Sequence, residues 1–321
     1  MNIEYIKCHG SGNDFILIDE ITHSYPFTEE ERRKISILLC DRSTGVGSDG
    51  ILFVMESKKA EARMRMFNSD GTEAEMCGNG LRCVARHVIE QLGKTKVEIE
   101  TEKAVLSVSQ VPQIFEGIDT FSVTIEPVSF KADSLPMIVE QEEAINIAIP
   151  ELSNQFTFTA LSVPNPHIVS MVEDYEQEEL AAIGRKANEL HEVFPNGVNV
   201  SFVRTIDKNK IFVQTYERGV GLTNACGTAM SASSIVSTLL GPNDLNQPIV
   251  VINKGGLVNC LVEKNGESYS IQLRGNGTNV YQAAVEVNIE EGVWKYSKDP
   301  EYNQEENDTY EKLKNYAASQ S

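Results

Sequence analysis

The stretch Met-Cys-Gly-Asn-Gly-Leu-Arg at positions 76–82 decides the fold, because a shorter version, Ala-Cys-Gly-Thr-Ala, returns at positions 225–229. In both stretches a cysteine is followed directly by glycine and then by a helical pattern. After Cys77, apolar residues recur at helical spacing up to Gly93, and after Cys226 the pattern ends at Gly241. We therefore predict two helices, each beginning at a cysteine.

The sequence before each cysteine repeats as well. Asn13 lies 64 residues before Cys77, and Asn165 lies 61 residues before Cys226. Each asparagine is followed by a predicted helix, a glycine-containing turn and a strand, in that order. Because these features keep the same order in both halves, duplication explains them better than chance.

The duplication predicts the fold class and the domain boundaries. Most of the remaining chain has the pattern of strands, so we expect an α/β (α+β) protein with two pseudo-symmetric domains. The first domain is expected to comprise residues 1–128 and a return segment at about 280–296, and the second residues 129–279. Residues 297–321 are polar and charged, which predicts a C-terminal tail that is mobile or loosely helical.

Composition excludes several classes of function. The formal net charge of -19 argues against nucleic-acid binding, which requires a basic surface. No apolar run is long enough to span a bilayer and the start of the chain lacks a secretory signal, so no membrane partner is expected. Six irregularly spaced cysteines in 321 residues favour free thiols in a reducing cytoplasm.

A thiol in the first turn of a helix suits proton transfer. The first backbone N–H groups of a helix carry partial positive charge, and a neighbouring glycine lets a carboxylate approach them. The same field is expected to lower the pKa of Cys77 and of Cys226 modestly. Inverting a stereocentre needs a base on one face of a carbon and an acid on the other. Two thiols, one from each half, therefore predict a cofactor-free epimerase acting on a small amino acid.

Two other interpretations of the cysteines, a metal site and simple packing, compete with this one. A zinc or thiol site formed by Cys77, Cys83 and His87 is the non-enzyme alternative, but that spacing matches no standard zinc motif. It also leaves Cys226 without a role, so no metal is expected. A buried cysteine outside such a motif is usually a packing residue, and this is the prediction for Cys8, Cys40, Cys83 and Cys260.

The motifs together resemble those of the diaminopimelate epimerase family, over about residues 6–287. Besides the two cysteine stretches they are Gly-Asn-Asp-Phe at 12–15, Asn-Ser-Asp-Gly at 68–71, Pro-Asn-Pro-His at 164–167, Gly-Val-Asn at 197–199 and Glu-Arg-Gly at 217–219. The resemblance implies that each domain is a curved mixed or antiparallel sheet around a central helix, with the active site in the cleft between the domains. It implies pyridoxal-phosphate-independent conversion of LL-2,6-diaminopimelate to the meso isomer, in lysine and peptidoglycan precursor synthesis.

The resemblance also assigns roles to individual residues. The catalytic acid–base pair would be Cys77 and Cys226, with His167 and Glu217 as the polar partners that poise the thiols. The residues implied to hold the reacting α-carboxylate are Gly78, Asn79, Gly227 and Thr228. The residues implied to bind the distal amino-acid end are Asn13, Asn68, Asn165, Asn199, Glu217 and Arg218.

The sequence departs from the family pattern at two positions and leaves one alternative enzyme. Leu222 stands where many members carry an acidic residue, and Ala229 replaces a common glycine. A racemase of the same superfamily, acting on histidine or a hydroxyproline, is the alternative. Arg218 and the asparagines favour a substrate that is an amino acid at both ends. Assembly into a homodimer is left open.

Overall fold

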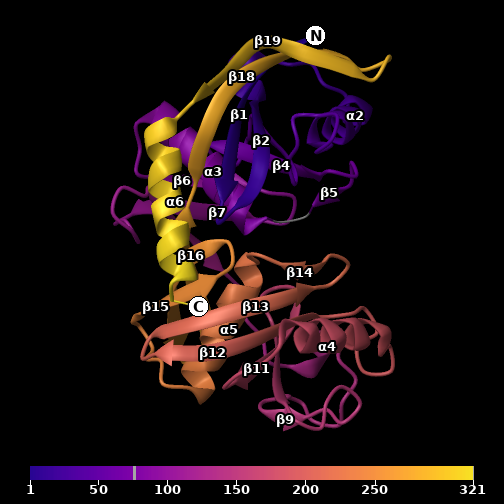
Figure 1. Cartoon of the computed structure of the whole chain (residues 1–321), viewed down its shortest axis with the longest axis vertical. Coiled ribbons are helices and arrows are strands. Elements are labelled where there is room, and N and C mark those ends of the chain that lie inside the picture. The colour runs from indigo at the N-terminus through magenta and orange to yellow at the C-terminus, as the bar shows by residue number, and fades with distance from the viewer. Residues whose placement is uncertain (75–76, 321) are drawn as a thin grey trace. The chain divides into compact units, whose positions relative to one another are not determined.

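The computed structural model describes residues 1–74 and 77–320, and these residues fold into two compact units (Figure 1). The first unit contains Met1–Val123 and Arg274–Leu313, and the second contains Thr124–Leu273 and the chain from Lys314 onward. The chain leaves the first unit within strand β8 and returns to it within strand β17. Both transitions lie somewhat before the predicted ones, at 128 and about 280.

The two units share one order of strand pairing. In the first unit, β2 is antiparallel to β1 and parallel to β3, and β4 is antiparallel to β3 and β5 and parallel to β6, which pairs with β7. In the second unit, β11 is antiparallel to β10 and parallel to β12, and β13 is antiparallel to β12 and β14 and parallel to β15, which pairs with β16. The predicted pseudo-symmetry is therefore confirmed strand by strand.

Many of the strands that form these sheets alternate buried and exposed residues or are buried on both faces. The strands of the first unit are β1 (Asn2–Gly10), β2 (Asn13–Asp19), β3 (Gly50–Met55), β4 (Ala62–Asn68), β5 (Glu73–Ala74), β6 (Lys96–Glu100), β7 (Val105–Val111), β18 (Thr278–Asn288) and β19 (Val293–Tyr302). Those of the second unit are β9 (Ile147–Ala148), β10 (Thr157–Ser162), β11 (Pro166–Val172), β12 (Asn199–Asp207), β13 (Lys210–Glu217), β14 (Gly221–Thr223), β15 (Pro248–Asn253) and β16 (Gly256–Asn265). The transition strands are β8 (Thr120–Ile125) and β17 (Ser268–Asn276).

Each unit has one central helix, and that helix begins after a cysteine as predicted. Helix α3 (Gly78–Leu92) contacts β1 to β4, β6 and β7, and helix α5 (Gly227–Leu240) contacts β10 to β13, β15 and β16. A flat sheet could not bring so many strands to one helix, so each sheet curves around its helix. Helix α3 ends at Gly93, whose φ of 62° is the left-handed conformation that favours glycine.

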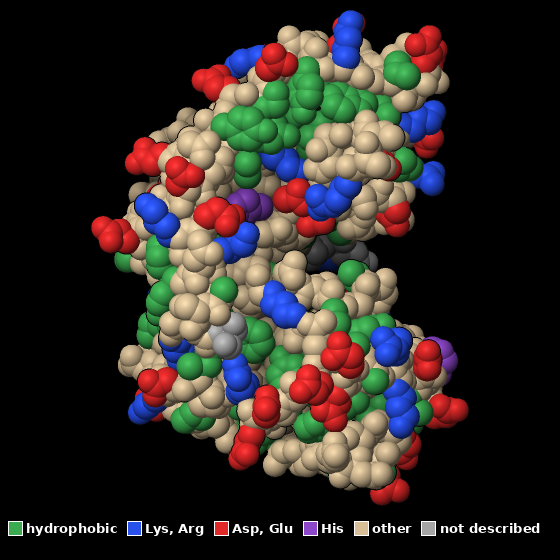
Figure 2. All heavy atoms as spheres, in the orientation of Figure 1, with side chains coloured by type: hydrophobic (Ala, Val, Ile, Leu, Met, Phe, Trp, Pro, Cys, Tyr) green, Lys and Arg blue, Asp and Glu red, His purple; other side chains and the backbone are tan. Residues whose placement is uncertain are grey.

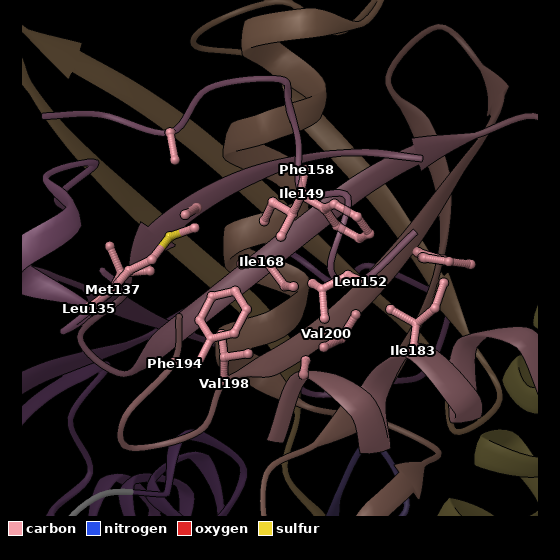
Figure 3. Close-up of a cluster of buried hydrophobic side chains, with 14 of the residues drawn as sticks. Leu135, Met137, Ile149, Leu152, Phe158, Ile168, Ile183, Phe194, Val198 and Val200 are labelled. Carbon is pink, nitrogen blue, oxygen red and sulfur yellow. The ribbon is translucent and has the colours of Figure 1, made fainter. Parts of the chain in front are cut away.

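A second helix covers the other face of each sheet. Helix α2 (Glu29–Cys40) lies between β2 and β3 in the chain, and α4 (Gln177–Glu189) lies between β11 and β12. The predicted capping box at the start of α2 is confirmed, with Thr28 and Glu31 bonded reciprocally. In the second unit, Ile183 of this helix belongs to a core that includes Val200 of β12 (Figure 3). The short helices α1 (Glu20–His23) and η1 (Ala132–Ser134) complete these layers.

Close packing of α4 on the sheet depends on a glycine. A Cβ atom at Gly184 would lie 2.2 Å from Cγ of Tyr216. We expect Gly184→Ala to lower the free energy of unfolding by about 1–3 kcal/mol, although alanine is the better helix former. Urea denaturation measures this. A Tyr216→Ala background removes Cγ but leaves the Cβ at position 216, which is 2.5 Å from the added atom. The same substitution should therefore cost less there than in the wild type, and an equal loss in both backgrounds would contradict the clash.

The C-terminal segment forms ordered secondary structure rather than the predicted polar tail. Strand β19 pairs with β18 through Tyr302, and helix α6 spans Gln304–Ala318. Tyr310 and Leu313 of this helix are 5% and 1% exposed. The burial of this helix was not predicted from the sequence because its buried side chains are few and lie between charged residues.

The surface of the first unit carries an apolar area. Figure 2 shows hydrophobic side chains gathered in the region of β18 and β19, where Val293 and Tyr302 are exposed. Acidic side chains are scattered over the visible face (Figure 2), in keeping with the net charge of -19. Among residues 1–74 and 77–320, every helix is too short or too polar to cross a membrane.

Candidate active site

The first half of the predicted site forms where Cys77 begins helix α3. Cys77 is the N-cap residue, with an extended backbone, and its sulfur accepts a hydrogen bond from the Gly80 N–H at 3.4 Å. The side chain is half-buried. A Cβ at Gly80 would lie 2.7 Å from Leu52, so glycine allows the first turn to approach the sheet. The first N–H groups of the helix, which have no partner within the helix itself, lie beside the thiol.

Three polar residues lie at one edge of the first sheet, next to this helix start. Asn13 begins β2, Asp49 precedes β3, and Asn68 ends β4. Because β2 and β3 are parallel and β4 is antiparallel to β3, these three ends meet at the same edge. The Asn68 amide donates to the Thr72 hydroxyl at 3.0 Å, which closes the turn after β4.

The Asn13 side chain connects this edge to the thiol. Its Oδ1 accepts from the Asn79 amide at 3.2 Å and lies 3.9 Å from the Cys77 sulfur. Its Nδ2 donates to Asp49 at 2.5 Å, which fixes the orientation of the amide. Asp49 also accepts from Arg42. Asp49 was not among the predicted site residues, although it directly precedes β3, much as Asn13 begins the parallel strand β2.

The Asn79 side chain is committed to protein contacts. Its Oδ1 accepts from Arg82 at 3.0 Å, and its Nδ2 donates to Asn13. The residue is 5% exposed. A carboxylate bound here would therefore meet the backbone N–H groups of Gly78 and Asn79 rather than the Asn79 amide.

The second unit repeats this arrangement around Cys226. Cys226 is the N-cap residue of α5, and its sulfur lies 3.5 Å from the Thr228 hydroxyl. Glu217 ends β13, and its carboxyl group lies near enough to Cys226 for its charge to raise the pKa of the thiol. Glu217 stands where Asn68 stands in the first unit, at the end of the strand before a short hairpin. A carboxyl group therefore accompanies the second thiol, whereas amides surround the first.

The predicted distal-end residues gather at the same edge of the second sheet. Asn165 precedes β11, Asn199 begins β12, and His167 pairs with Asn199 in register. His167 Nε2 lies 3.0 Å from Asn165 Oδ1 and 3.5 Å from Asn199 Nδ2. The Arg218 backbone N–H donates to Asn199 Oδ1 at 2.8 Å. The Arg218 guanidinium donates to the Asn196 carbonyl at 2.8 Å and keeps other N–H groups available to a ligand.

His167 differs from its predicted role as a partner of a thiol. It is fully buried, and the hydrogen bonds described for it reach the two asparagines. Burial, and next the charge of Arg218, lower the pKa of His167 to about 3. The imidazole is thus neutral at physiological pH and supports the asparagines that surround it.

Burial dominates the ionisation of the two thiols. It raises the pKa of Cys77 to about 11, against the opposing effect of the Gly80 N–H. It also raises the pKa of Cys226, and the nearby Glu217 adds to this shift. The prediction that the helix ends would lower both pKa values is therefore wrong for the free protein, because removal of water outweighs the helix field. Burial likewise raises the pKa of Glu217.

The residues of the alternative zinc site are engaged elsewhere. His87 Nε2 lies 3.0 Å from Asp19, which ends β2, and Cys83 is buried in α3. Within the described part of the chain, no three potential metal ligands lie together.

Comparison with known proteins places these features in a family. The family model for diaminopimelate epimerase matches residues 5–114 and 159–280. A diaminopimelate epimerase of Clostridium acetobutylicum is 46% identical over 288 residues, which are 89% of this chain and 86% of the relative. One of Ligilactobacillus salivarius is 44% identical, over 91% of this chain and 94% of the relative. The chain belongs to the diaminopimelate epimerase family.

Solved structures support the fold more distantly. A PhzF-family phenazine biosynthesis protein of Bacillus anthracis superposes with a TM-score of 0.66 at 17% identity, covering 89% of this chain and all of that one. A hydroxyproline epimerase of Agrobacterium vitis gives a TM-score of 0.57 at 14% identity, covering 88% and 91%. The diaminopimelate epimerase family thus shares its two-domain architecture with other proteins.

The two departures from the family pattern are packing changes. Leu222 lies in β14 opposite Tyr216 and packs against the hydrophobic core of the second unit. Ala229 is fully buried in α5. Neither side chain brings a polar group to the Cys226 turn.

Proposed function

We propose that this protein is a diaminopimelate epimerase that inverts one α-carbon without pyridoxal phosphate, using Cys77 and Cys226 as acid and base. The observation that supports this most is the duplication: each sheet carries a helix whose N-cap is a cysteine, and polar residues line the same edge of each sheet. Membership of the family supports the choice of substrate, LL-2,6-diaminopimelate, and of the meso product.

The chemistry is a proton transfer in two parts. The thiolate of one cysteine takes the α-proton, and the thiol of the other gives its proton to the opposite face of the planar carbanion. The enzyme ends with the protonation states of the two cysteines exchanged. Backbone N–H groups at each helix start are suited to the α-carboxylate, where the carbanion charge is delocalised. One well-placed donor of this kind stabilises a transition state by roughly 2.7–4 kcal/mol.

Glu217 supplies the acceptor that the second thiol needs. Both cysteines have raised pKa values, so a neutral solution would leave them protonated. The Glu217 carboxylate lies near Cys226 and is proposed to take its proton, which creates the thiolate as substrate displaces water. We assign Glu217 this role, and we assign His167 the role of orienting Asn165 and Asn199.

Arg218 and the asparagines are proposed to recognise the distal amino-acid group. Arginine presents a fork of N–H donors to a carboxylate, and asparagine oxygens accept from an ammonium. We expect Arg218→Ala to lower kcat/KM about 10- to 100-fold, mainly through KM, because a hydrogen bond to a charged group contributes about 1.5–3 kcal/mol. Steady-state kinetics measure this effect. The control is Arg185→Ala, because Arg185 is an exposed arginine on α4. An unchanged KM would contradict the assignment.

The choice of substrate is tested with a panel of amino acids. Purified protein is incubated under reducing conditions with LL-diaminopimelate, L-histidine and trans-4-hydroxy-L-proline, and optical rotation is followed. The proposal predicts turnover of diaminopimelate alone. Turnover of histidine or hydroxyproline instead would favour the racemase alternative, and stoichiometric zinc in the purified protein would favour the thiol–metal alternative.

We propose a cytoplasmic enzyme because free thiols are required, and a homodimer remains a prediction. Cell fractionation and light scattering of the purified protein test these two statements.

A further inference from the structure

The C-terminal segment beyond the family match contacts the helix that carries Cys77. Glu306, in the first turn of α6, forms a two-pronged ion pair with Arg86 of α3, and its Oε2 lies 3.1 Å from Arg86 Nη2. The two side chains are 14% and 8% exposed. Glu306 also accepts from the Asn279 backbone N–H at 3.0 Å and from the Asn303 amide at 2.7 Å. The carboxylate is thus held from several sides.

Tyr310 lies one turn further along α6 and packs against the end of β1. Its ring centroid lies 4.2 Å from that of His9, at the end of β1, and the side chain is 5% exposed. The Asn276 amide donates to the His9 carbonyl at 3.2 Å, and its Oδ1 accepts from the Ser11 N–H at 2.8 Å. Tyr310 therefore packs against a hydrogen-bonded cluster at the start of the Asn13 turn.

Arg82 joins this cluster to the thiol. It is fully buried, one turn before Arg86 on α3, and donates to the Asn276 carbonyl at 2.9 Å. Its Nη2 donates to the Ser11 hydroxyl at 3.1 Å and to Asn79 Oδ1 at 3.0 Å. Asn79 holds Asn13, and the oxygen of Asn13 faces the Cys77 sulfur. On the Glu306 side, Arg86 donates to the Gly277 carbonyl at 2.7 Å, and Gly277 follows Asn276 in the chain. Side-chain contacts and this short stretch of backbone therefore connect α6 to the thiol.

We propose that Glu306 and Tyr310 are positioning residues that hold the start of α3, and with it the Cys77 thiol, in its working geometry. Loss of the Glu306 charge would leave the buried Arg86 with the Gly277 carbonyl, the exposed carboxylate of Glu90 and the more distant Asp119. The helix would then shift to bring Arg86 toward water. The consequence for catalysis rests on the proposed function, whereas the effect on the thiol does not.

The test compares Glu306→Gln with Glu305→Gln in the full-length protein. Glu305 is exposed in the same helical turn and serves as the matched control. Alkylation of Cys77 and of Cys226 by iodoacetamide is followed separately by peptide mass spectrometry across pH. Cys226 lies in the other unit and reports any general loss of stability.

We expect Glu306→Gln to change the alkylation rate of Cys77 severalfold while that of Cys226 and the Glu305→Gln variant stay at wild-type values. We also expect kcat to fall roughly ten- to a hundredfold with little change in KM, because small misplacements of reacting groups carry losses of this size. Tyr310→Ala, which removes the ring that packs against His9, should act in the same direction. If Glu306→Gln fails to fold, Glu306→Asp, which keeps the charge on a shorter chain, is measured in its place.

Equal alkylation of Cys77 in Glu306→Gln and wild type, or equal changes at both cysteines, would overturn the proposal. A selective change at Cys77 without loss of turnover would support the positioning role and count against the proposed function instead.

Discussion

Cys77→Ala is expected to lower the turnover of LL-diaminopimelate by about 10²–10⁴-fold, the usual contribution of a general acid or base. Cys226→Ala is expected to have an effect of the same order, because each thiol serves one face of the carbon and neither can replace the other. Steady-state measurement of kcat in both directions checks this, with circular dichroism to verify folding.

The control for these variants is Cys260→Ala. Cys260 is fully buried in β16 and lies outside the site residues, so it reports the cost of losing a buried thiol. We expect it to affect stability rather than kcat. Turnover at the wild-type rate in Cys77→Ala would refute the assignment of this residue.

Glu217→Gln is expected to lower kcat/KM about 10²-fold, because the variant lacks the group that accepts the Cys226 proton. The pH dependence has a definite sign. Burial raises the pKa of Glu217, so wild-type kcat/KM should rise with pH as this group loses its proton. In Glu217→Gln that ionisation should disappear from the profile of kcat/KM against pH.

Glu178→Gln provides the matched control for Glu217. Glu178 is an exposed carboxylate on α4 of the same unit, and its replacement should leave both the rate and the profile unchanged. A Glu217→Gln profile that keeps the wild-type ionisation would show that another group accepts the proton.

The architecture was predictable because the two halves of the sequence contain the same motifs in the same order. The two Cys-Gly stretches and their preceding asparagines mark equivalent positions, and the strands between them alternate clearly enough to be recognised. The capping box at Thr28 and the glycine that ends α3 are local signals that determine helix boundaries by themselves.

Other features depend on contacts between residues far apart in the chain. Asp49 is 36 positions from Asn13, and only the parallel pairing of β2 and β3 brings them together. Glu306 and Arg86 form an ion pair although they are 220 positions apart in the chain. A contact between such distant residues cannot be recognised from the sequence, so the packing of the C-terminal helix was not predicted. The pKa of Cys77 was predicted in the wrong direction because a sequence shows a helix start but not its burial.

Turnover of LL-diaminopimelate in heavy water tests the pairing of the two thiols most directly. The account predicts that the first meso product carries one deuterium, at the inverted α-carbon, while unreacted LL substrate remains unlabelled, because the proton is removed by one sulfur and solvent-derived deuterium is delivered by the other. Meso product that forms without deuterium would contradict it.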